Sequence, residues 1–410
     1  MNFNTRLLHG KAVKKYGDGA TLPQIAQVNA FRYDTAGEME KVFNHKAMGF
    51  AYSRVANPTV AAFEQRINEM EHGNGAVAVS SGMTAISLTL LNFLSAGDEV
   101  IASSGLYGGT LDLLGDLSKF GIKTKLVRDM TSESIESQLN EHTKVIFGEV
   151  ISNPGLEVLD IRKLADFAHG YGIPLIVDAT TATPFLVNPI DLGADIVIHS
   201  TTKYINGSGD AIGGVVIDRA RFPWDFEKFP GLGGYESYGK AAFMVRLRTD
   251  IAEHMGGIMN PVSAYLNVIG LETLGLRMKE ICSNAWKLAQ TLDSEFPELC
   301  VNYPLLEKNR CSKLAFGQLN GMGGGILTFR AGTKEKAFKI IDNLKYAVRA
   351  TSIGDVRTLV IHPQSTLYIR SDDEGKEAAG VYEDMVRISV GIEDSDDLIS
   401  DFEDTIKKYI

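Results

Sequence analysis

The segment 195-DIVIHSTTKYING-207 places a lysine at the end of a core strand. Its run of Ile196, Val197 and Ile198 is typical of a buried strand, and a row of hydroxyl side chains leads from it to Lys203. Removing an ammonium group from water is costly, so lysine is seldom found at such a position. A specific partner for this lysine is therefore expected, and the neighbouring strands indicate what it is.

Short apolar strands alternate with helices between about Asn57 and Ile217. Two segments with helical periodicity, 58–71 and 82–94, are interleaved with strand-like runs. These runs are 98–103, 122–129, 144–149, 173–179 and 195–200. Such alternation predicts an α/β fold with a mostly parallel central sheet and helices on both faces.

The pattern changes after the glycine-, proline- and aromatic-rich loop 221–243. There follow, in order, a long helical region at 262–296, a strand near 325–330, a helix near 335–344, strands near 357–362 and 386–392, and a final helix. This half predicts a smaller C-terminal α+β domain. A chain of 410 residues exceeds what a single core usually holds. We therefore expect an irregular N-terminal arm at 1–55 that contacts a neighbouring subunit, a large domain at 56–255 and a C-terminal domain at 256–410.

The composition excludes several classes of protein. A net charge of −10 argues against a general nucleic-acid binder, which needs a basic surface. The three cysteines are odd in number and lack CxxC spacing, so we expect neither a disulfide framework nor a metal site. No signal-peptide core is evident at the start, and the apolar runs are too short to cross a bilayer. We therefore expect a cytoplasmic protein without a membrane partner.

Chemically useful side chains stand where the predicted strands end. In open parallel sheets, ligands bind beyond the carboxyl ends of the strands. Asp178, Glu149 and Lys203 each lie at or just beyond the end of a strand-like run. Ser81 and Gly82 begin a predicted helix, whose free N–H groups favour an anion and above all a phosphate.

One ligand accounts for these features together, namely pyridoxal 5′-phosphate (PLP). Its aldehyde needs a lysine for a Schiff base, which would be Lys203, and its ring nitrogen needs a carboxylate, which would be Asp178. The candidates to hold its phosphate are the N–H groups of Gly82 and Met83 and the hydroxyls of Ser200 and Thr202. Tyr107, in 105-GLYGG-109, is the candidate to lie flat against the ring.

Each of these assignments has an ordinary structural alternative. A lysine after a strand is usually solvated, serines are common N-caps, and a tyrosine packs more often than it stacks on a ligand. The functional interpretation is favoured because the residues fall at strand ends or helix starts of one sheet. The glycine-rich segments 207–214 and 231–239 lack the strand-to-helix context of a dinucleotide fingerprint.

Six segments carry a resemblance to a known family: 52-YSRVANPT-59, 80-SSGMTAI-86, 105-GLYGGT-110, 178-DATTATP-184, 200-STTKY-204 and 386-VRISVGIED-394. Through them the chain resembles, over nearly its whole length, the cysteine/methionine-metabolism family of fold-type I PLP enzymes. The resemblance implies that Tyr52 and Arg54 reach the PLP phosphate of a neighbouring subunit. The active unit would then be a homodimer with shared sites, usually within a homotetramer. Arginine suits this role because its planar fork matches phosphate.

The resemblance also implies further roles. Asn153 would contact the 3′-oxygen of the ring, and Arg387 with Ser352 would hold the substrate α-carboxylate. The predicted cofactor-binding set is Tyr52, Arg54, Ser81, Gly82, Met83, Tyr107, Asn153, Asp178, Thr180, Ser200, Thr202 and Lys203. The predicted catalytic residues are Lys203, Tyr107 and Asp178, and the predicted substrate-binding residues are Arg387, Ser352 and Tyr52.

Within the family, the chain resembles the O-acetylhomoserine sulfhydrylases most closely, through the segments 236–261 and 358–366. Gly109 stands where methionine γ-lyases typically carry a reactive cysteine. The chain departs from the family at Ala179, Thr181 and Ser208, which usually are Asn, Phe and His, and its central loop is shorter.

The activity that this resemblance implies is γ-replacement on O-acetyl-L-homoserine by a sulfur nucleophile, in methionine biosynthesis. The products would be acetate and homocysteine, or methionine from methanethiol. The alternative within enzymes is γ-elimination to 2-oxobutanoate, ammonia and a thiol, and the alternative outside enzymes is a binding or scaffold protein. The sulfur donor (sulfide, thiol or carrier protein) and the ester (acetyl or succinyl) stay open.

Overall fold

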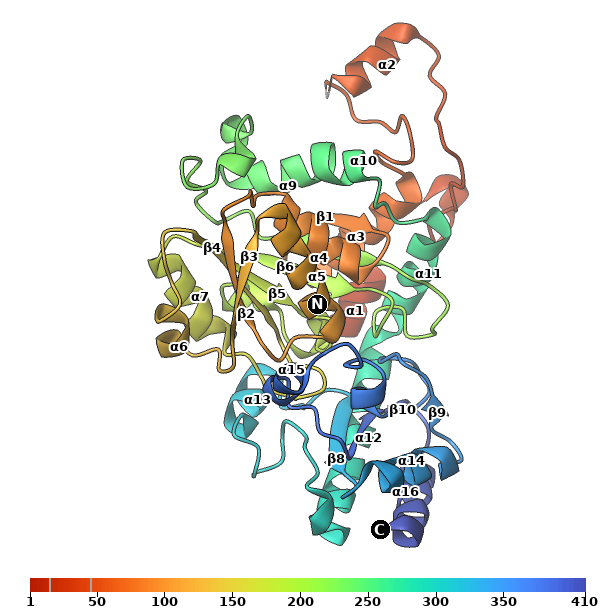
Figure 1. Cartoon of the computed structure of the whole chain (residues 1–410). Helices are drawn as coiled ribbons and strands as arrows, with labels where there is room; N and C mark the ends of the chain where they lie inside the picture. Colours follow the sequence, from red (N-terminus) through yellow and green to blue (C-terminus); the bar gives the residue numbers. More distant parts are fainter. Residues whose placement is uncertain (15, 45) are drawn as a thin grey trace.

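A seven-stranded sheet forms the centre of the larger part of the molecule (Figure 1). The structure, a computed structural model, describes residues 1–14, 16–44 and 46–410. The strands of this sheet are β1 (Gly75–Val79), β2 (Glu99–Ser103), β3 (Lys123–Val127), β4 (Thr143–Glu149), β5 (Leu175–Asp178), β6 (Ile196–Ser200) and β7 (Gly214–Asp218). Their order is β1-β7-β6-β5-β4-β2-β3, and only β7 runs antiparallel to its neighbours. The predicted α/β class with a mostly parallel sheet is confirmed.

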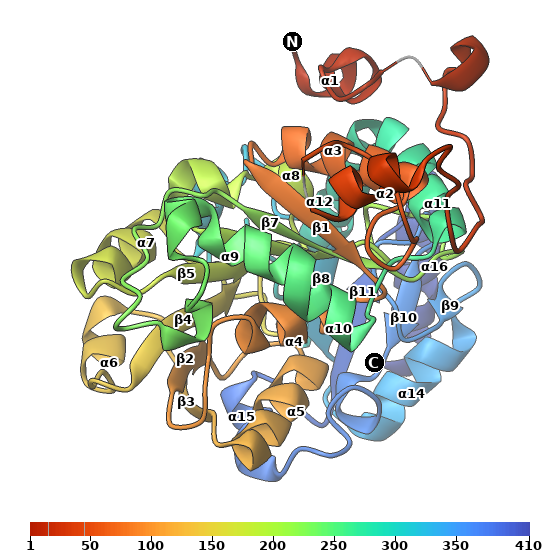
Figure 2. The same ribbon diagram turned by 90° about the horizontal axis from the view of Figure 1, so that it is seen from above.

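Helices cover both faces of this sheet, as the alternation of the sequence predicts. On one face lie α3 (Pro58–Met70), α7 (Ile161–Gly170), α11 (Pro261–Glu272) and the first turns of α12 (Leu274–Glu295). On the other face lie α4 (Gly82–Leu91), α5 (Gly108–Leu117) and α9 (Ala242–Arg246). Figure 2 shows α3 and the pair α4 and α5 on opposite sides of β1. Successive strand residues enter opposite cores: Val197 packs in the first, and Ile196 and Ile198 pack in the second.

The helices next to the strand ends begin with the signals that the sequence suggests. Asn57 accepts the N–H of Thr59 at 2.9 Å, and Pro58 follows as the first helical residue of α3. Ser81 caps α4 by accepting the N–H of Thr84 at 3.0 Å. Both helix starts are thus determined locally.

A four-stranded sheet organises the smaller part of the chain, at the bottom of Figure 1. Its strands are β8 (Ile326–Arg330), β9 (Val348–Arg349), β10 (Leu359–Ile361) and β11 (Met385–Ser389), in the order β8-β11-β10-β9. Its helices are α13 (Ser312–Gln318), α14 (Lys334–Asn343), α15 (Asp373–Ala378) and α16 (Ser395–Tyr409). The expected smaller α+β part is therefore present, while the residue boundaries proposed for the domains stay predictions.

The arm differs from the irregular segment that the sequence predicts. It contains α1 (Phe3–His9), which contacts α3, α11 and α12 and buries Leu7. It also contains α2 (Ala36–Phe43), which buries no residue and stands away from the body of the chain (Figure 1). Lys15 and His45, which belong to the predicted arm, lie outside the described residues.

The long helical region predicted at 262–296 is two helices, α11 and α12, which meet at Thr273. The physical reason is Arg277, whose guanidinium group donates to Gly270 O at 2.6 Å and so satisfies a terminal carbonyl of α11. The same group donates to Tyr204 O at 2.6 Å, which ties this junction to the turn after Lys203. The break thus depends on a contact between remote segments.

Three short helices complete the larger part: α6 (Ser132–Glu136), α8 (Thr183–Leu186) and α10 (Ala252–Met255). None of the helices within residues 1–14, 16–44 and 46–410 combines the length and the hydropathy that a bilayer-spanning helix requires.

Candidate active site

A cavity of about 200 Å³ lies at the carboxyl ends of β4, β5 and β6, where the two parts of the chain meet. The structure brings twelve of the predicted residues to its wall: Ser81, Gly82, Met83, Tyr107, Asn153, Asp178, Thr180, Ser200, Thr202, Lys203, Ser352 and Arg387. The other two, Tyr52 and Arg54, do not line the cavity of their own chain.

Lys203 lies in the turn after β6, and its Nζ donates to Ser352 Oγ at 3.1 Å. Burial, with the positive charge of Arg387 nearby, lowers the pKa of Lys203 to about 8. Desolvation disfavours the charged ammonium form, and a like charge adds to that effect. Near neutral pH, an appreciable fraction of this amine is therefore unprotonated and able to act as a nucleophile or a base.

The low pKa of Lys203 predicts when its amine becomes reactive. In cofactor-free protein, trace acetylation of Lys203 by acetic anhydride should rise with a midpoint near pH 8, because only the unprotonated amine reacts. Lys119 is the control: its hydrogen bond to Asp116 raises its pKa, so its acetylation should rise at a higher pH than that of Lys203. Peptide mass analysis measures both residues. Equal midpoints would contradict the electrostatic environment assigned to Lys203.

Asp178 and Glu149 are paired neighbours at the carboxyl ends of β5 and β4. Asp178 is buried, and one carboxylate oxygen accepts the N–H of Thr180 at 2.9 Å. Burial raises the pKa of Asp178, while the hydrogen bonds from Thr180, and next the nearby His199, oppose this rise. Thr180 Oγ1 also accepts the N–H of Ser200 at 2.8 Å, so this side chain ties the end of β5 to the end of β6. Asp178 is thus a fixed acidic group in the cavity wall.

The N-terminus of α4 meets Ser200 at the edge of the cavity. Because N–H groups of a first helical turn lack intrahelical partners, those of Gly82 and Met83 can bind an anion. A Cβ atom on Gly82 would stand 2.6 Å from Ser200 Cβ and 2.9 Å from Ser200 Oγ, so this close approach requires glycine. The groups predicted to hold a phosphate therefore lie together.

The close approach at Gly82 makes a prediction for stability. Replacing Gly82 by Ala is expected to destabilise the fold by about 1–3 kcal/mol, because the added methyl group overlaps Ser200. Gly115→Ala is the matched control: Gly115 lies inside α5 with open space around it, and alanine there should stabilise the fold by about 0.5–1 kcal/mol. Thermal unfolding of both variants measures the difference. Equal effects at the two glycines would show that Ser200 yields to the new side chain.

Two other predicted residues are already engaged within the chain. Thr202 Oγ1 donates to Gly213 O at 3.2 Å and accepts the N–H of Gly213 at 3.0 Å. It can therefore donate to a phosphate only by releasing the first of these bonds. The N–H of Tyr107 donates to Glu149 Oε1 at 2.8 Å, whereas its side chain is 38% exposed. The Tyr107 ring is thus available to cover a planar ligand.

Arg387 lies on β11 and is almost completely buried. Its guanidinium group donates to Ser352 O at 2.8 Å and to Asn153 Oδ1 at 3.1 Å, and its Nε has no partner within the described residues. Burial lowers the pKa of Arg387 to about 10, so it remains charged at neutral pH. A buried cation without a facing carboxylate favours an anionic ligand, and Nε is a free donor for it.

Tyr52 and Arg54 lie on the arm side of the chain. Arg54 donates to Glu253 O at 2.9 Å, and its guanidinium carbon stands 5.5 Å from the centre of the Tyr52 ring. Both side chains are about two-fifths exposed. Their expected role in a neighbouring subunit stays a prediction.

Several residues of the cavity were not assigned roles from the sequence. Thr110, Thr351 and Leu367 line the wall, and Glu149 was noted only as a strand end. Thr110 belongs to the quoted motif 105-GLYGGT-110, so a signal for it existed. Leu367 and Thr351 come from segments far from the predicted strand ends, and local patterns gave no sign of them.

The departures from the family pattern are accommodated locally. Thr181 is buried, and its hydroxyl donates to Ile151 O at 2.9 Å instead of contributing an aromatic ring. Ser208 lies in a turn that is held by Asn206, whose Oδ1 accepts the N–H of Ser208 at 3.1 Å. Neither residue blocks the cavity.

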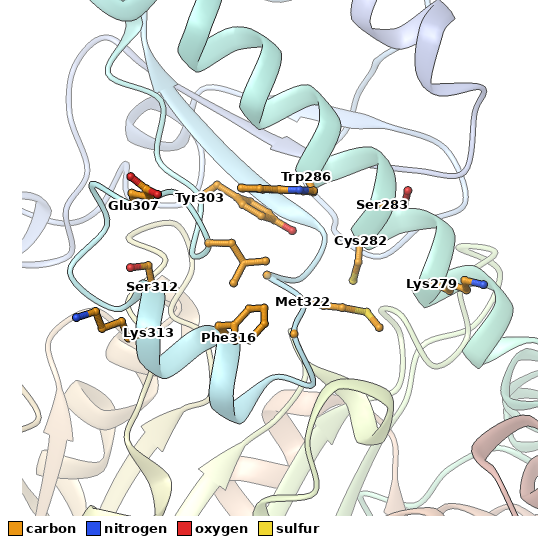
Figure 3. Close-up of a pocket in the computed structure, with 13 residues that line it drawn as sticks. Lys279, Cys282, Ser283, Trp286, Tyr303, Glu307, Ser312, Lys313, Phe316 and Met322 are labelled. Carbon is orange, nitrogen blue, oxygen red and sulfur yellow. The ribbon is translucent and has the colours of Figure 1, made fainter.

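A larger hollow of about 960 Å³ lies elsewhere, between α12 and α13 (Figure 3). Trp286, Tyr303, Phe316 and Met322 surround it, and Lys279, Lys313 and Glu307 lie at its rim. None of the residues predicted to bind PLP or substrate lines this hollow, whereas twelve of them line the smaller cavity, so the chemistry points to the smaller cavity.

The smaller cavity fits PLP on the observations above. It offers a lysine with a lowered pKa, a buried carboxyl group, and helix N–H groups beside a serine. These are, respectively, the groups needed for an aldehyde, a protonated ring nitrogen and a phosphate. Asn153 and Tyr107 line the same cavity and would be the residues that contact the ring.

Comparison with known proteins agrees with this fit. The family model of Cys/Met metabolism PLP-dependent enzymes matches residues 4–407. O-acetyl-L-homoserine sulfhydrylase of Corynebacterium glutamicum is 39% identical, over 98% of this chain and 96% of its own length. Homocysteine synthase of Schizosaccharomyces pombe is 38% identical, over 98% of this chain and 97% of its own length.

A solved structure shows the same architecture. It is assigned as an O-acetylhomoserine (thiol)-lyase of Campylobacter jejuni, and it contains N′-pyridoxyl-lysine-5′-monophosphate. Its TM-score is 0.94 at 33% identity, and the match covers 99% of this chain and all of that one. The expected fold-type I architecture is thereby confirmed. The chain belongs to the family of PLP-dependent enzymes of cysteine and methionine metabolism.

Proposed function

We propose that this protein catalyses γ-replacement on O-acetyl-L-homoserine with a sulfur nucleophile. With hydrosulfide, the bond between Cγ and the ester oxygen breaks, a bond between Cγ and sulfur forms, and the products are L-homocysteine and acetate. The reaction involves no net oxidation. The observation that carries the proposal is the convergence of Lys203, Asp178 and Arg387 on one cavity. The choice of substrate is supported by the names of the relatives.

Bound PLP would supply an electron sink that stabilises negative charge on the substrate carbons. In this chain, Asp178 would keep the ring nitrogen protonated, and the α4 N-terminus with Ser200 would hold the phosphate. Asn153 and Tyr107 would fix the plane of the ring. The position of these side chains at the cavity wall supports these roles.

Lys203 is the proposed base. Its amine, with a pKa of about 8, would take the proton from Cα of the substrate, release it to solvent and, neutral again, take a proton from Cβ. Both carbons would be reprotonated after sulfur has bonded to Cγ. Ser352 Oγ, 3.1 Å from Nζ, would hold the amine in position between these transfers. Tyr107, whose side chain is partly exposed at the cavity, is the proposed proton donor as the acetate leaves.

Arg387 is the proposed anchor of the substrate α-carboxylate. Its Nε is unpartnered and its other nitrogens are held by Ser352 O and Asn153 Oδ1, so the fork is already oriented. A pre-oriented guanidinium group binds a carboxylate with little further loss of freedom. This would place Cα within reach of Lys203 on the same wall.

A direct assay tests the proposed function. The purified protein with PLP is incubated with O-acetyl-L-homoserine in the presence and absence of sulfide, and homocysteine, acetate and 2-oxobutanoate are measured. We expect homocysteine and acetate in equal amounts with sulfide. If 2-oxobutanoate is the main product while sulfide is present, the protein is a γ-lyase instead. O-succinylhomoserine and methanethiol in parallel arms identify the preferred ester and sulfur donor.

We further propose a homodimer with shared active sites within a homotetramer, in which Tyr52 and Arg54 reach the phosphate of the neighbouring site. The exposure of both side chains in the single chain supports this arrangement. Mixing a Lys203→Ala chain with an Arg54→Ala chain should restore activity, up to about one quarter of that of the wild type if chains exchange at random. Activity no higher than that of either parent would rule out the shared contact. A cytoplasmic location stays a prediction.

A further inference from the structure

Glu149 is the one carboxyl group of the cavity wall to which the proposed reaction assigns no role. It ends β4 directly beside Asp178, its register partner on β5. It also lines a second, more polar hollow behind the cavity, so its side chain separates the two spaces. Any charge on it would act on Asp178 at close range.

The contacts of Glu149 suit a neutral carboxyl group. Oε1 accepts the N–H of Tyr107 at 2.8 Å, while Oε2 is buried and has no hydrogen-bond partner within the described residues. An ionised carboxylate has about four acceptor sites to satisfy, and a buried one with a single bond is strongly disfavoured. If Glu149 is protonated, the unpartnered Oε2 carries much less charge than it would in the carboxylate.

The groups around Glu149 also favour its neutral form. Burial, and next the negative charge of Asp178, raise the pKa of Glu149 well above its ordinary value. The N–H groups of Tyr107 and Asn153 oppose this rise, but only the first is within hydrogen-bond geometry. Two adjacent buried carboxyl groups cannot both ionise readily. Glu149 Oε2 is buried without a partner, whereas Asp178 accepts the N–H of Thr180 at 2.9 Å and Thr180 favours its ionised form. Glu149 is therefore the member of the pair that we expect to keep the proton.

Cations also line the second hollow, namely Arg128, Lys163 and Arg310, and none of them forms an ion pair with Glu149. On the side of the smaller cavity, besides Asp178 and Tyr107, three further ionisable groups stand nearby. Tyr368, a buried phenol, donates to Leu106 O at 2.9 Å and so closes the wall next to Tyr107. Lys203 faces the cavity from the turn after β6 and Arg387 faces it from β11. Both make their hydrogen bonds to Ser352 or Asn153 rather than to Glu149. No described cation therefore pairs with Glu149.

We propose that Glu149 is a positioning residue that stays protonated: Oε1 holds the backbone of Tyr107 at the start of α5, and its neutrality leaves Asp178 as the single buried negative charge at this edge of the sheet. The inference rests on the proposed function only in assuming that PLP binds in this cavity. It makes Glu149 a support for the two residues that contact the ring rather than a catalytic residue.

The test compares two substitutions in the PLP-loaded protein. Glu149→Gln keeps an acceptor oxygen for the Tyr107 N–H and is neutral at every pH, whereas Glu149→Leu removes the acceptor. We expect Glu149→Gln to bind PLP and turn over within about threefold of the wild type, and Glu149→Leu to bind PLP about 10-fold more weakly. Glu141→Gln, at an exposed position just before β4, is the matched control and should change neither quantity.

The pH dependence of the visible absorption of bound PLP gives a readout that a merely structural role would not move. The profiles of Glu149→Gln and the wild type should coincide, because both side chains are neutral. A displacement of about one pH unit or more would mean that the wild-type carboxyl is ionised, and would overturn the proposal. The proposal would also be overturned if Glu149→Leu bound PLP as tightly as Glu149→Gln does.

Infrared spectroscopy addresses the proton directly and does not need turnover. A carboxylic-acid C=O band that is present in the wild type at neutral pH and absent in Glu149→Gln supports the proposal. If the band is missing from the wild type, the inference fails. Should the wild type bind PLP yet lack γ-replacement, the proposed function fails while these spectra still decide the state of Glu149.

Discussion

Lys203→Ala is expected to lower the turnover of γ-replacement by about 10²–10⁴-fold, the range that a positioned general base contributes. The reason is that Lys203 provides the only amine at the described cavity wall, with its pKa lowered to about 8 by burial and by Arg387. Ser352, its hydrogen-bond partner, has no basic group to replace it. Steady-state kinetics with O-acetyl-L-homoserine and sulfide measure the loss.

The control for Lys203→Ala is Lys228→Ala. Lys228 also has a lowered pKa, through burial, but its Nζ donates to Tyr171 O at 2.7 Å, and neither residue lines the cavity. Its replacement should leave turnover within about twofold, since surface substitutions rarely exceed 0.5 kcal/mol. Added methylamine should partly restore Lys203→Ala, because a small amine can enter the space left by the side chain. Lys203→Ala activity within tenfold of the wild type would remove Lys203 from the mechanism.

Arg387→Leu is expected to lower kcat/KM by about 10–150-fold, chiefly through KM. Hydrogen bonds to a charged group each contribute about 1.5–3 kcal/mol, and the α-carboxylate would lose its cation. Arg387→Lys keeps the charge but not the planar fork, so it should recover only part of this loss. Arg330→Leu, on the neighbouring strand β8, is the matched control: Arg330 pairs with Asp384 outside the cavity.

Thermal unfolding separates binding from folding in the Arg387 series. Arg387→Leu relieves a costly buried charge but leaves Ser352 O and Asn153 Oδ1 without this donor, so the unfolding temperature should fall by only a few degrees. A large drop in that temperature, with KM unchanged, would make Arg387 a structural residue and leave the carboxylate anchor unidentified.

The strand ends could be predicted because their signals are local. Apolar runs of four to eight residues bounded by polar ones mark strands, and Ser81 before Gly82 marks a helix start. Parallel strands then bring Asp178, Glu149 and Ser200 to one edge by topology alone. The family resemblance contributed Arg387 and Asn153, which no local pattern singles out.

Other elements escaped prediction because their formation depends on remote segments. Strand β1 has three Gly or Ala residues among its five, which weakens its strand signal despite the two valines, and it is stabilised by pairing with β7 far along the chain. The break between α11 and α12 depends on Arg277 reaching Gly270 and Tyr204. The helix α1 in the arm depends on its contacts with α3, α11 and α12.

Periodicity and capping within single segments were enough to predict the α/β class and the helix start at Gly82. They were also enough to place Lys203 and Asp178 at the ends of strands. The hydrogen-bond partners and the pKa values of these groups, in contrast, depend on the tertiary structure. Lys203 meets Ser352 across 149 positions and Arg387 meets Asn153 across 234 positions. Desolvation and charge proximity, which set the pKa values of Lys203 and Glu149, arise only when such distant segments close around one cavity.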